Sequence, residues 1–182
     1  PDFAEAHNNL GNIFKELGKL NEAEASYKHA IELKPDFAEA HNNLGDSFRE
    51  QGKLTEAETS YLQAISLKPD FADAHLGLCD LLEKTNRVDH ALLAIRNAKV
   101  SVTEKKEDFL LFEAQVLFRE KNYISAWDLI KKINKDDLLE KRQASFHKLK
   151  ADLFHAKKEY DEAFEEFRSM NEVTQNSEDY NK

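Results

Sequence analysis

The chain has little glycine, proline or cysteine, and each shortage narrows the range of folds. Among its 182 residues there are 5 glycines, 3 prolines and a single cysteine, Cys79. Sandwiches and barrels need many turns rich in glycine and proline, so this composition argues against both and favours helices. One cysteine excludes an internal disulfide network and a cysteine-based metal site. It does not fix the cellular compartment, for which we favour the cytoplasm.

Long apolar runs and clusters of basic residues are also missing. No run of about 18 apolar residues occurs, so we expect no membrane insertion. The formal net charge is −9, with 26 basic residues scattered among 35 acidic ones. A diffuse acidic surface repels phosphate groups, so nucleic acid is not an expected partner.

What the chain has instead is an internal repeat. Residues 4–37 and 38–71 are identical at 25 of their 34 positions, and a third copy begins at Ala72 and then decays. The alanine at the centre of each second helix recurs at intervals of 34, 34, 35 and 37 residues. A period of 34 is typical of solenoids built from helix–turn–helix repeats. The alanines in question are Ala23, Ala57, Ala91, Ala126 and Ala163.

Within each copy the residue types predict two antiparallel helices. Gly18 is expected to end the first helix in the left-handed conformation. Asn21 and Thr55 are predicted to cap the second helices, with Glu24 and Glu58 completing capping boxes. Proline ends each of the first two repeats, and the acidic residue after it is expected to cap the next helix. The predicted helices span 4–17, 21–33, 38–51, 55–67, 72–84, 88–100, 105–120, 123–133, 137–156 and 160–172.

This pattern of small and large residues resembles that of the tetratricopeptide-repeat (TPR) family. The first copy meets the family signature at Leu10, Gly11, Phe14, Gly18, Ala23, Tyr27, Ala30 and Pro35, and the second copy meets it 34 residues further on. The resemblance implies an all-α fold, a right-handed α-solenoid of about five helix–turn–helix repeats. We expect one array over 1–173 and a polar tail over 174–182. Its repeats would be 4–37, 38–71, 72–105, 107–136 and 137–173.

Motifs for chemistry are lacking, and we expect no catalytic residues, no cofactor and no metal site. Neither glycine-rich phosphate loop occurs, and neither GxSxG nor HExxH is present. His7, His41 and His75 recur at the repeat period, but helices stacked about 8–10 Å apart cannot bring them to one ion. We expect them, Cys79 and the aromatic residues of the last two repeats to pack in the core. Those aromatic residues are Phe109, Phe112, Trp127, Phe164 and Phe167.

The resemblance implies that the first helices of the repeats line a concave groove. Asparagine amides there could hold the backbone of an extended peptide, since they both donate and accept hydrogen bonds. This is similar to the asparagine ladder of O-GlcNAc transferase repeats, taken at Asn9 and Asn43, with Gly77 at the third position. Alternatively, the asparagines bond neighbouring repeats and stiffen the stack. The acids Asp46 and Asp80 favour a basic or neutral guest. The candidate groove residues are Asn8, Asn9, Asn12, Asn42, Asn43, Asp46, Arg49 and Asp80.

The expected function is that of a protein-interaction scaffold, not an enzyme, with a peptide or a protein as partner. The alternative is the substrate-recruiting TPR segment of a multidomain transferase, whose catalytic domain would lie outside these residues. Two features suggest it: the opening Pro-Asp-Phe recurs at repeat ends, and the last repeat resembles that of bacterial TPR–sulfotransferase proteins. Weak self-association through the N-terminal repeat is a further expectation, because no helix precedes the apolar edge near Phe3 and Ala6. The last helix is expected to present a charged outer face.

Overall fold

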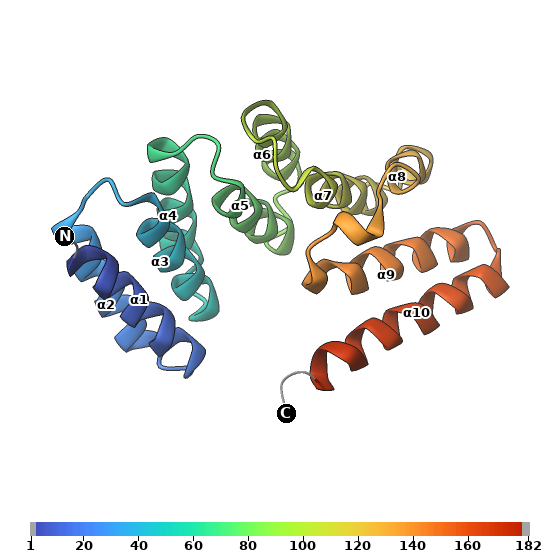
Figure 1. Cartoon of the computed structure of the whole chain (residues 1–182). Helices are drawn as coiled ribbons and strands as arrows, with labels where there is room; N and C mark the ends of the chain where they lie inside the picture. Colours follow the sequence, from blue (N-terminus) through green and yellow to red (C-terminus); the bar gives the residue numbers. More distant parts are fainter. Residues whose placement is uncertain (1–2, 180–182) are drawn as a thin grey trace. The chain divides into compact units, whose positions relative to one another are not determined.

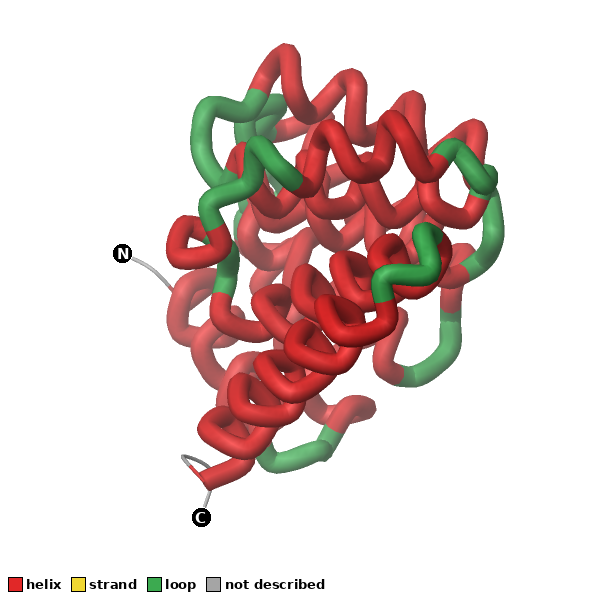
Figure 2. Tube along the Cα trace, turned by 90° about the vertical axis from the view of Figure 1, so that its right-hand side faces the viewer, coloured by secondary structure: helices red, strands yellow, loops and turns green. Residues whose placement is uncertain are grey.

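A computed structural model describes residues 3–179 of the chain, and within that range it contains helices and no strand (Figure 1). The all-α fold predicted from the repeat is confirmed. The short loops of Figure 2 join successive helices. Residues 1–2, the first two of the predicted array, lie outside the described residues. So do residues 180–182, the last three of the predicted tail. The helices are α1 (Phe3–Glu16), α2 (Leu20–Leu33), α3 (Ala38–Glu50), α4 (Leu54–Leu67), α5 (Ala72–Lys84), α6 (Val88–Ser101), α7 (Lys106–Arg119), α8 (Tyr123–Ile130), the 3₁₀ turn η1 (Lys135–Asp137), α9 (Glu140–Ala156) and α10 (Tyr160–Asp179).

The chain divides into two compact units, one ending at Thr103 and the other beginning at Glu104. The first unit holds the three hairpins α1–α2, α3–α4 and α5–α6, each packed against the next. The second unit holds the hairpins α7–α8 and α9–α10. Among residues 3–179, no helix is both long enough and apolar enough to cross a bilayer.

The turn inside each hairpin takes the left-handed backbone conformation that the glycines predict. Gly18 has a φ of 71° and Gly52 a φ of 75°. Asn86 replaces the glycine in the third hairpin with a φ of 57°, and Lys121 and Lys158 do so in the second unit at 61° and 65°. Asparagine is enriched in this region whereas lysine is uncommon there, so the last two turns are the more strained.

The predicted caps at Asn21 and Thr55 are wrong. The helices α2 and α4 begin one residue earlier, and neither has a side-chain cap. The reason lies in the preceding turn. The backbone N–H of Lys19 already bonds the carbonyl of Phe14 at 2.9 Å, so the glycine turn closes the first helix and leads directly into the second. The acidic residues after the prolines do not cap α3 and α5 either, since Phe37 and Phe71 hold the N-cap positions without a side-chain bond.

Glu24 joins repeats instead of completing a capping box. Its carboxylate accepts hydrogen bonds from Lys53 at 2.9 Å and Gln51 at 3.2 Å, both in the next repeat, and from Lys28 at 2.7 Å. Burial raises the pKa of Glu24, but these bonds outweigh it and lower the pKa to about 2. The same contact recurs between Glu58 and Arg87. These glutamates therefore fix each second helix to the turn of the following repeat.

The repeating histidines bond the loops between repeats. The Nε2 of His41 lies 3.0 Å from the carbonyl oxygen of Pro35, and that of His75 lies 2.9 Å from the carbonyl of Pro69. A carbonyl only accepts, so Nε2 carries the proton in both rings. His7 packs edge-on against His29. His75 is buried, as predicted, whereas His7 and His41 are only partly buried, so their predicted place in the core is not fully met.

The outer edge of α1 is apolar and exposed. Phe3 is 77% exposed, and Leu10, Ile13 and Leu17 are 39–64% exposed along the same face, because no helix of residues 3–179 covers it. The equivalent residues are buried: Phe37, which precedes α3, and Leu44 of α3. Self-association through this edge stays a prediction.

In the second unit the aromatic residues are only partly in the core. Phe109 and Phe112 are 1% and 2% exposed, as predicted, and Trp127 packs against the core cluster. Phe164 and Phe167 are 67% and 36% exposed, so their predicted burial is wrong. Part of each ring is therefore open to water on α10. The same helix runs on to Asp179, past its predicted end at residue 172.

Candidate functional site

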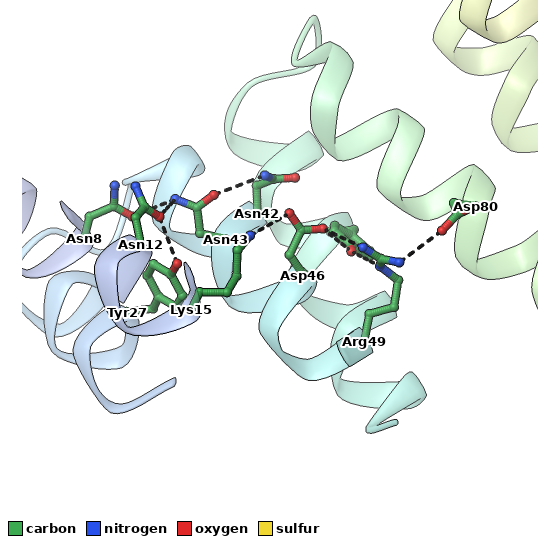
Figure 3. Close-up of polar contacts among 10 residues, drawn as sticks. Asn8, Asn12, Lys15, Tyr27, Asn42, Asn43, Asp46, Arg49 and Asp80 are labelled. Carbon is green, nitrogen blue, oxygen red and sulfur yellow. Dashed lines mark hydrogen bonds and ion pairs between the residues drawn. The ribbon is translucent and has the colours of Figure 1, made fainter. Parts of the chain in front are cut away.

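The first helices of the first unit form one continuous face, shown in part in Figure 3. Helix α1 contacts α3 and α3 contacts α5, while no comparable contact joins α2 to α4 or α4 to α6 within residues 3–103. Because the first helices lie closer together than the second helices, they form the inner side of this unit. We call this surface the first-helix face. It carries Asn9, Asn12 and Lys15 of α1, Asn43, Asp46 and Arg49 of α3, and Gly77 and Asp80 of α5.

Asparagines on this face bond one repeat to the next. The Nδ2 of Asn43 donates to the Oδ1 of Asn8 at 3.0 Å and to the Oδ1 of Asn12 at 3.2 Å (Figure 3). The Tyr27 hydroxyl donates to the same Asn12 oxygen at 2.8 Å. These bonds therefore agree with the interpretation in which the asparagines join neighbouring repeats and stiffen the stack.

The five candidate asparagines differ in their access to water. Asn8 and Asn42 are each only 7% exposed, so they lie below the face. Asn9 is exposed, and Asn12 and Asn43 are half-buried. The amides that a guest could reach are therefore those of Asn9, Asn12 and Asn43.

The third position of the ladder lacks an asparagine for a steric reason. A Cβ added at Gly77 would lie 2.6 Å from Cε1 of Tyr61, and one added at Gly45 would lie 2.8 Å from the same atom. The Tyr61 ring is fully buried between these two glycines. A side chain at Gly77 would have to displace the ring.

Ion pairs cross the face in the same direction. The Nζ of Lys15 lies 3.5 Å from Oδ2 of Asp46, and an Nη of Arg49 lies 3.2 Å from Oδ2 of Asp80. Lys84 adds a second cation to Asp80 at 2.9 Å. Each acid is therefore paired with a cation of its own chain. This weakens the expected attraction of Asp46 and Asp80 for a basic guest, because their charge is already offset.

Tyr61 holds the middle of the ion-pair row in place. Its hydroxyl donates to Oδ1 of Asp46 at 2.7 Å and accepts from Nε of Arg49 at 3.2 Å. Burial and the Asp46 carboxylate raise the pKa of Tyr61, so the hydroxyl keeps its proton. The face thus offers amide and charged groups in fixed positions, an arrangement suited to hydrogen bonding of a peptide.

Sequence reasoning missed these partners, although the sequence contains a signal for them. Lys15 precedes Asp46 by 31 residues, Arg49 precedes Asp80 by 31, and Asn12 precedes Asn43 by 31. This spacing is three residues shorter than the repeat. It therefore pairs a residue of one first helix with a residue that lies about one helical turn earlier in the first helix of the next repeat. A search for complementary residues at that spacing would have listed all three pairs as candidates, although the helix separation that brings them into contact comes from the structure.

Replacing the buried Asn42 with leucine is expected to stabilise the first unit by about 1–2 kcal/mol. The Oδ1 of Asn42 is buried without a hydrogen-bond partner in the described part of the chain. The equivalent residue of the third repeat is already a leucine, Leu76, which is 4% exposed. Urea unfolding followed by circular dichroism measures the change. The matched control is Asn8→Leu, which removes an oxygen that does accept a bond and is expected to give no gain. A destabilised Asn42→Leu variant would contradict the prediction.

These helical hairpins, repeated with a period of 34 residues and joined through their first helices, define the class of α-helical repeat solenoids. The sequence identifies the repeat: residues 11–48 and 45–86 match the family model for the TPR repeat. Residues 11–86 therefore carry tetratricopeptide repeats, as the resemblance predicted, and repeats of this family typically mediate protein–protein interaction.

Solved structures share this fold at low sequence identity. PilF of Pseudomonas aeruginosa has a TM-score of 0.79 at 20% identity, over 94% of this chain and 76% of that one. MamA of Desulfovibrio magneticus RS-1 has a TM-score of 0.73 at 15% identity, over 97% of each chain. YrrB, described as a TPR protein with an unusual peptide-binding site, has a TM-score of 0.64 at 19% identity, over 92% and 84%. No curated protein sequence matches the chain. At these identities the likeness shows the fold alone.

Proposed function

We propose that the chain is a protein-interaction scaffold whose first-helix face holds an extended segment of a partner protein. The observation that carries the proposal is the row of accessible amides at Asn9, Asn12 and Asn43. Two of these are already oriented by bonds within the chain. Because little freedom remains to be lost when a peptide binds, the entropic cost of association is small. The peptide-binding site named for YrrB, which has the same fold, agrees with this proposal.

The chemistry of the face indicates what a guest would bond. The Nδ2 of Asn12 can donate to a backbone carbonyl and the Oδ1 of Asn43 can accept from a backbone N–H, because the other amide groups of these two residues already bond within the chain. The exposed amide of Asn9 can do both, and such bonds carry little preference for side chains. The paired charges at Asp46, Arg49 and Asp80 give the face little net charge. We therefore expect a guest recognised mainly through its backbone. The alternative, a recruiting segment of a transferase, rests on the likeness of the repeats and assigns the same role to this face.

Alanine at Asn9 and at Asn43 together is expected to weaken binding of such a peptide about tenfold, because each lost backbone bond contributes about 0.5–1.5 kcal/mol. The measurement is isothermal titration with a peptide selected against the wild-type chain from a random display library. Asn9→Ala alone separates binding from stability, since Asn9 is exposed, whereas Asn43 also joins repeats.

The matched control is Asn21→Ala, which removes an exposed asparagine from α2. Wild-type affinity is expected for it. Equal affinity of the control and the double variant would show that the peptide binds elsewhere.

A further inference from the structure

The second unit carries an open cleft along α9 and α10, which lie antiparallel and in contact (Figure 1). Its volume is about 480 Å³. One ring from each helix contributes to the lining, together with acidic residues of α10. The lining residues are Phe154, Asp161, Glu162, Phe164, Glu165 and Glu166. We call this the α9–α10 cleft.

The aromatic part of the cleft faces water. Phe164 is 67% exposed, and Tyr160 and Phe167 on the same helix are 59% and 36% exposed. The helix is attached to α9 through other residues, above all Ala163, which is 4% exposed. Clustered aromatic rings outside the core are typical of surfaces that bind another molecule.

The acidic residues of the cleft are not equally available. Glu166 is bound within the chain by Nδ1 of His147 at 2.7 Å and Nζ of Lys150 at 2.6 Å. Glu165 pairs with Arg168 on the surface. Asp161 and Glu162 have no ion pair in the part of the chain that the structure describes. The cleft therefore presents two uncompensated carboxylates beside an exposed ring.

The chain itself shows which group fits between a ring and a carboxylate. In the core of the same unit, the Arg142 guanidinium lies 4.0 Å from the centroid of the Phe112 ring. Its Nε lies 3.3 Å from Oδ1 of Asp108. A planar guanidinium stacks on a ring and forms an ion pair with a carboxylate at the same time, which an ammonium group does less well.

We propose that the α9–α10 cleft is a second interaction surface and binds an arginine-bearing basic segment of a partner protein. The guanidinium stacks on Phe164 and bonds Asp161 or Glu162, and a neighbouring apolar side chain covers Phe154. Charge complementarity selects this partner, because the carboxylates repel acidic segments and the ring disfavours a purely polar one. The surface lies in the second unit and is independent of the role proposed for the first-helix face.

Fluorescence anisotropy with a labelled peptide, Gly-Arg-Leu-Arg-Gly, tests the proposal at low and at physiological ionic strength. Removing both free charges by Asp161→Asn with Glu162→Gln is expected to weaken binding about tenfold at low salt. Phe164→Ala is expected to weaken it about fivefold. A peptide with lysine binds less tightly, and one with citrulline, which keeps the shape but not the charge, does not bind.

Two control variants make the result specific. Glu22→Gln with Glu56→Gln removes the same number of exposed carboxylates from the first unit and is expected to leave peptide binding unchanged. Asn43→Ala perturbs the first-helix face and is expected to have no effect either. Unchanged fluorescence of Trp127 shows that the substitutions in α10 leave the second unit folded.

Several outcomes would overturn the proposal. Equal affinity for the arginine and citrulline peptides would exclude recognition by charge. A loss of binding in Asn43→Ala, with none in the α10 variants, would place the peptide on the first-helix face. Light scattering that shows a dimer in the wild type and a monomer in Phe164→Ala would assign the cleft to a second copy of the chain.

Discussion

Leucine in place of Asp108 is expected to lower the free energy of unfolding of the second unit by about 3–5 kcal/mol. The Asp108 side chain is fully buried, and the Arg142 guanidinium that faces it is 14% exposed and stacked on Phe112. Without the carboxylate, Arg142 keeps its positive charge inside the protein and loses the ion pair with Asp108. The loss is large because a charge that is removed from water depends on the charges within the protein.

The pKa of Asp108 indicates that the pair itself adds little stability. Burial raises this pKa above its ordinary value, although Arg142 and the backbone N–H of Leu139 act to lower it. A carboxyl group with a raised pKa in the folded state stabilises the fold below its unfolded pKa, and that contribution is lost as the pH rises through the folded pKa. Replacing both members, by Asp108→Leu with Arg142→Met, is therefore expected to recover most of the loss.

Urea unfolding followed by the fluorescence of Trp127 measures both changes. Trp127 is the only tryptophan of the chain and lies in the second unit, so its signal reports that unit. The control is Asp152→Leu, which breaks an exposed pair with Lys148 and is expected to cost less than about 1 kcal/mol. If Asp108→Leu costs no more than this control, the buried pair is not the structural element described here.

Alanine in place of Tyr61 is expected to destabilise the first unit by about 3–5 kcal/mol. The ring is fully buried and fills the space beside Gly45 and Gly77. A Cβ added at either glycine would lie 2.8 Å or less from the ring. Those glycines leave a cavity that neighbouring side chains cannot fill once the ring is removed. Its hydroxyl also bonds Asp46 and Arg49, which lose a common anchor.

The phenylalanine variant separates the ring from the hydroxyl. Tyr61→Phe keeps the packing and removes only the bonds to the two charged groups, so we expect a loss of about 1–3 kcal/mol. Hydrogen exchange of the backbone amides of α3 and α5 reports stability within the first unit. A loss in Tyr61→Ala no larger than in Tyr61→Phe would show that the ring does not fill the space between repeats.

The sequence by itself determined the local structure of this protein. The 34-residue period, the glycines at 18 and 52 and the prolines between repeats predict antiparallel helix pairs and place their turns. The turn glycines and the helix periodicity act within one hairpin, so they can be read from a single copy of the repeat, whereas the 34-residue period is found by comparing successive copies. Burial of Phe109 and Phe112 followed from the same periodicity.

Only the tertiary structure decided which side chains make contacts between one hairpin and the next. Glu24 bonds the next repeat instead of capping its own helix, Asn43 bonds Asn8 and Asn12, and the Tyr61 ring takes the space that a side chain at Gly77 would need. The exposure of Phe164 was missed because its helix is amphipathic whether or not another helix covers it. Contacts of this kind depend on the separation of stacked helices and on which faces have neighbours, and neither quantity is contained in the pattern of one repeat.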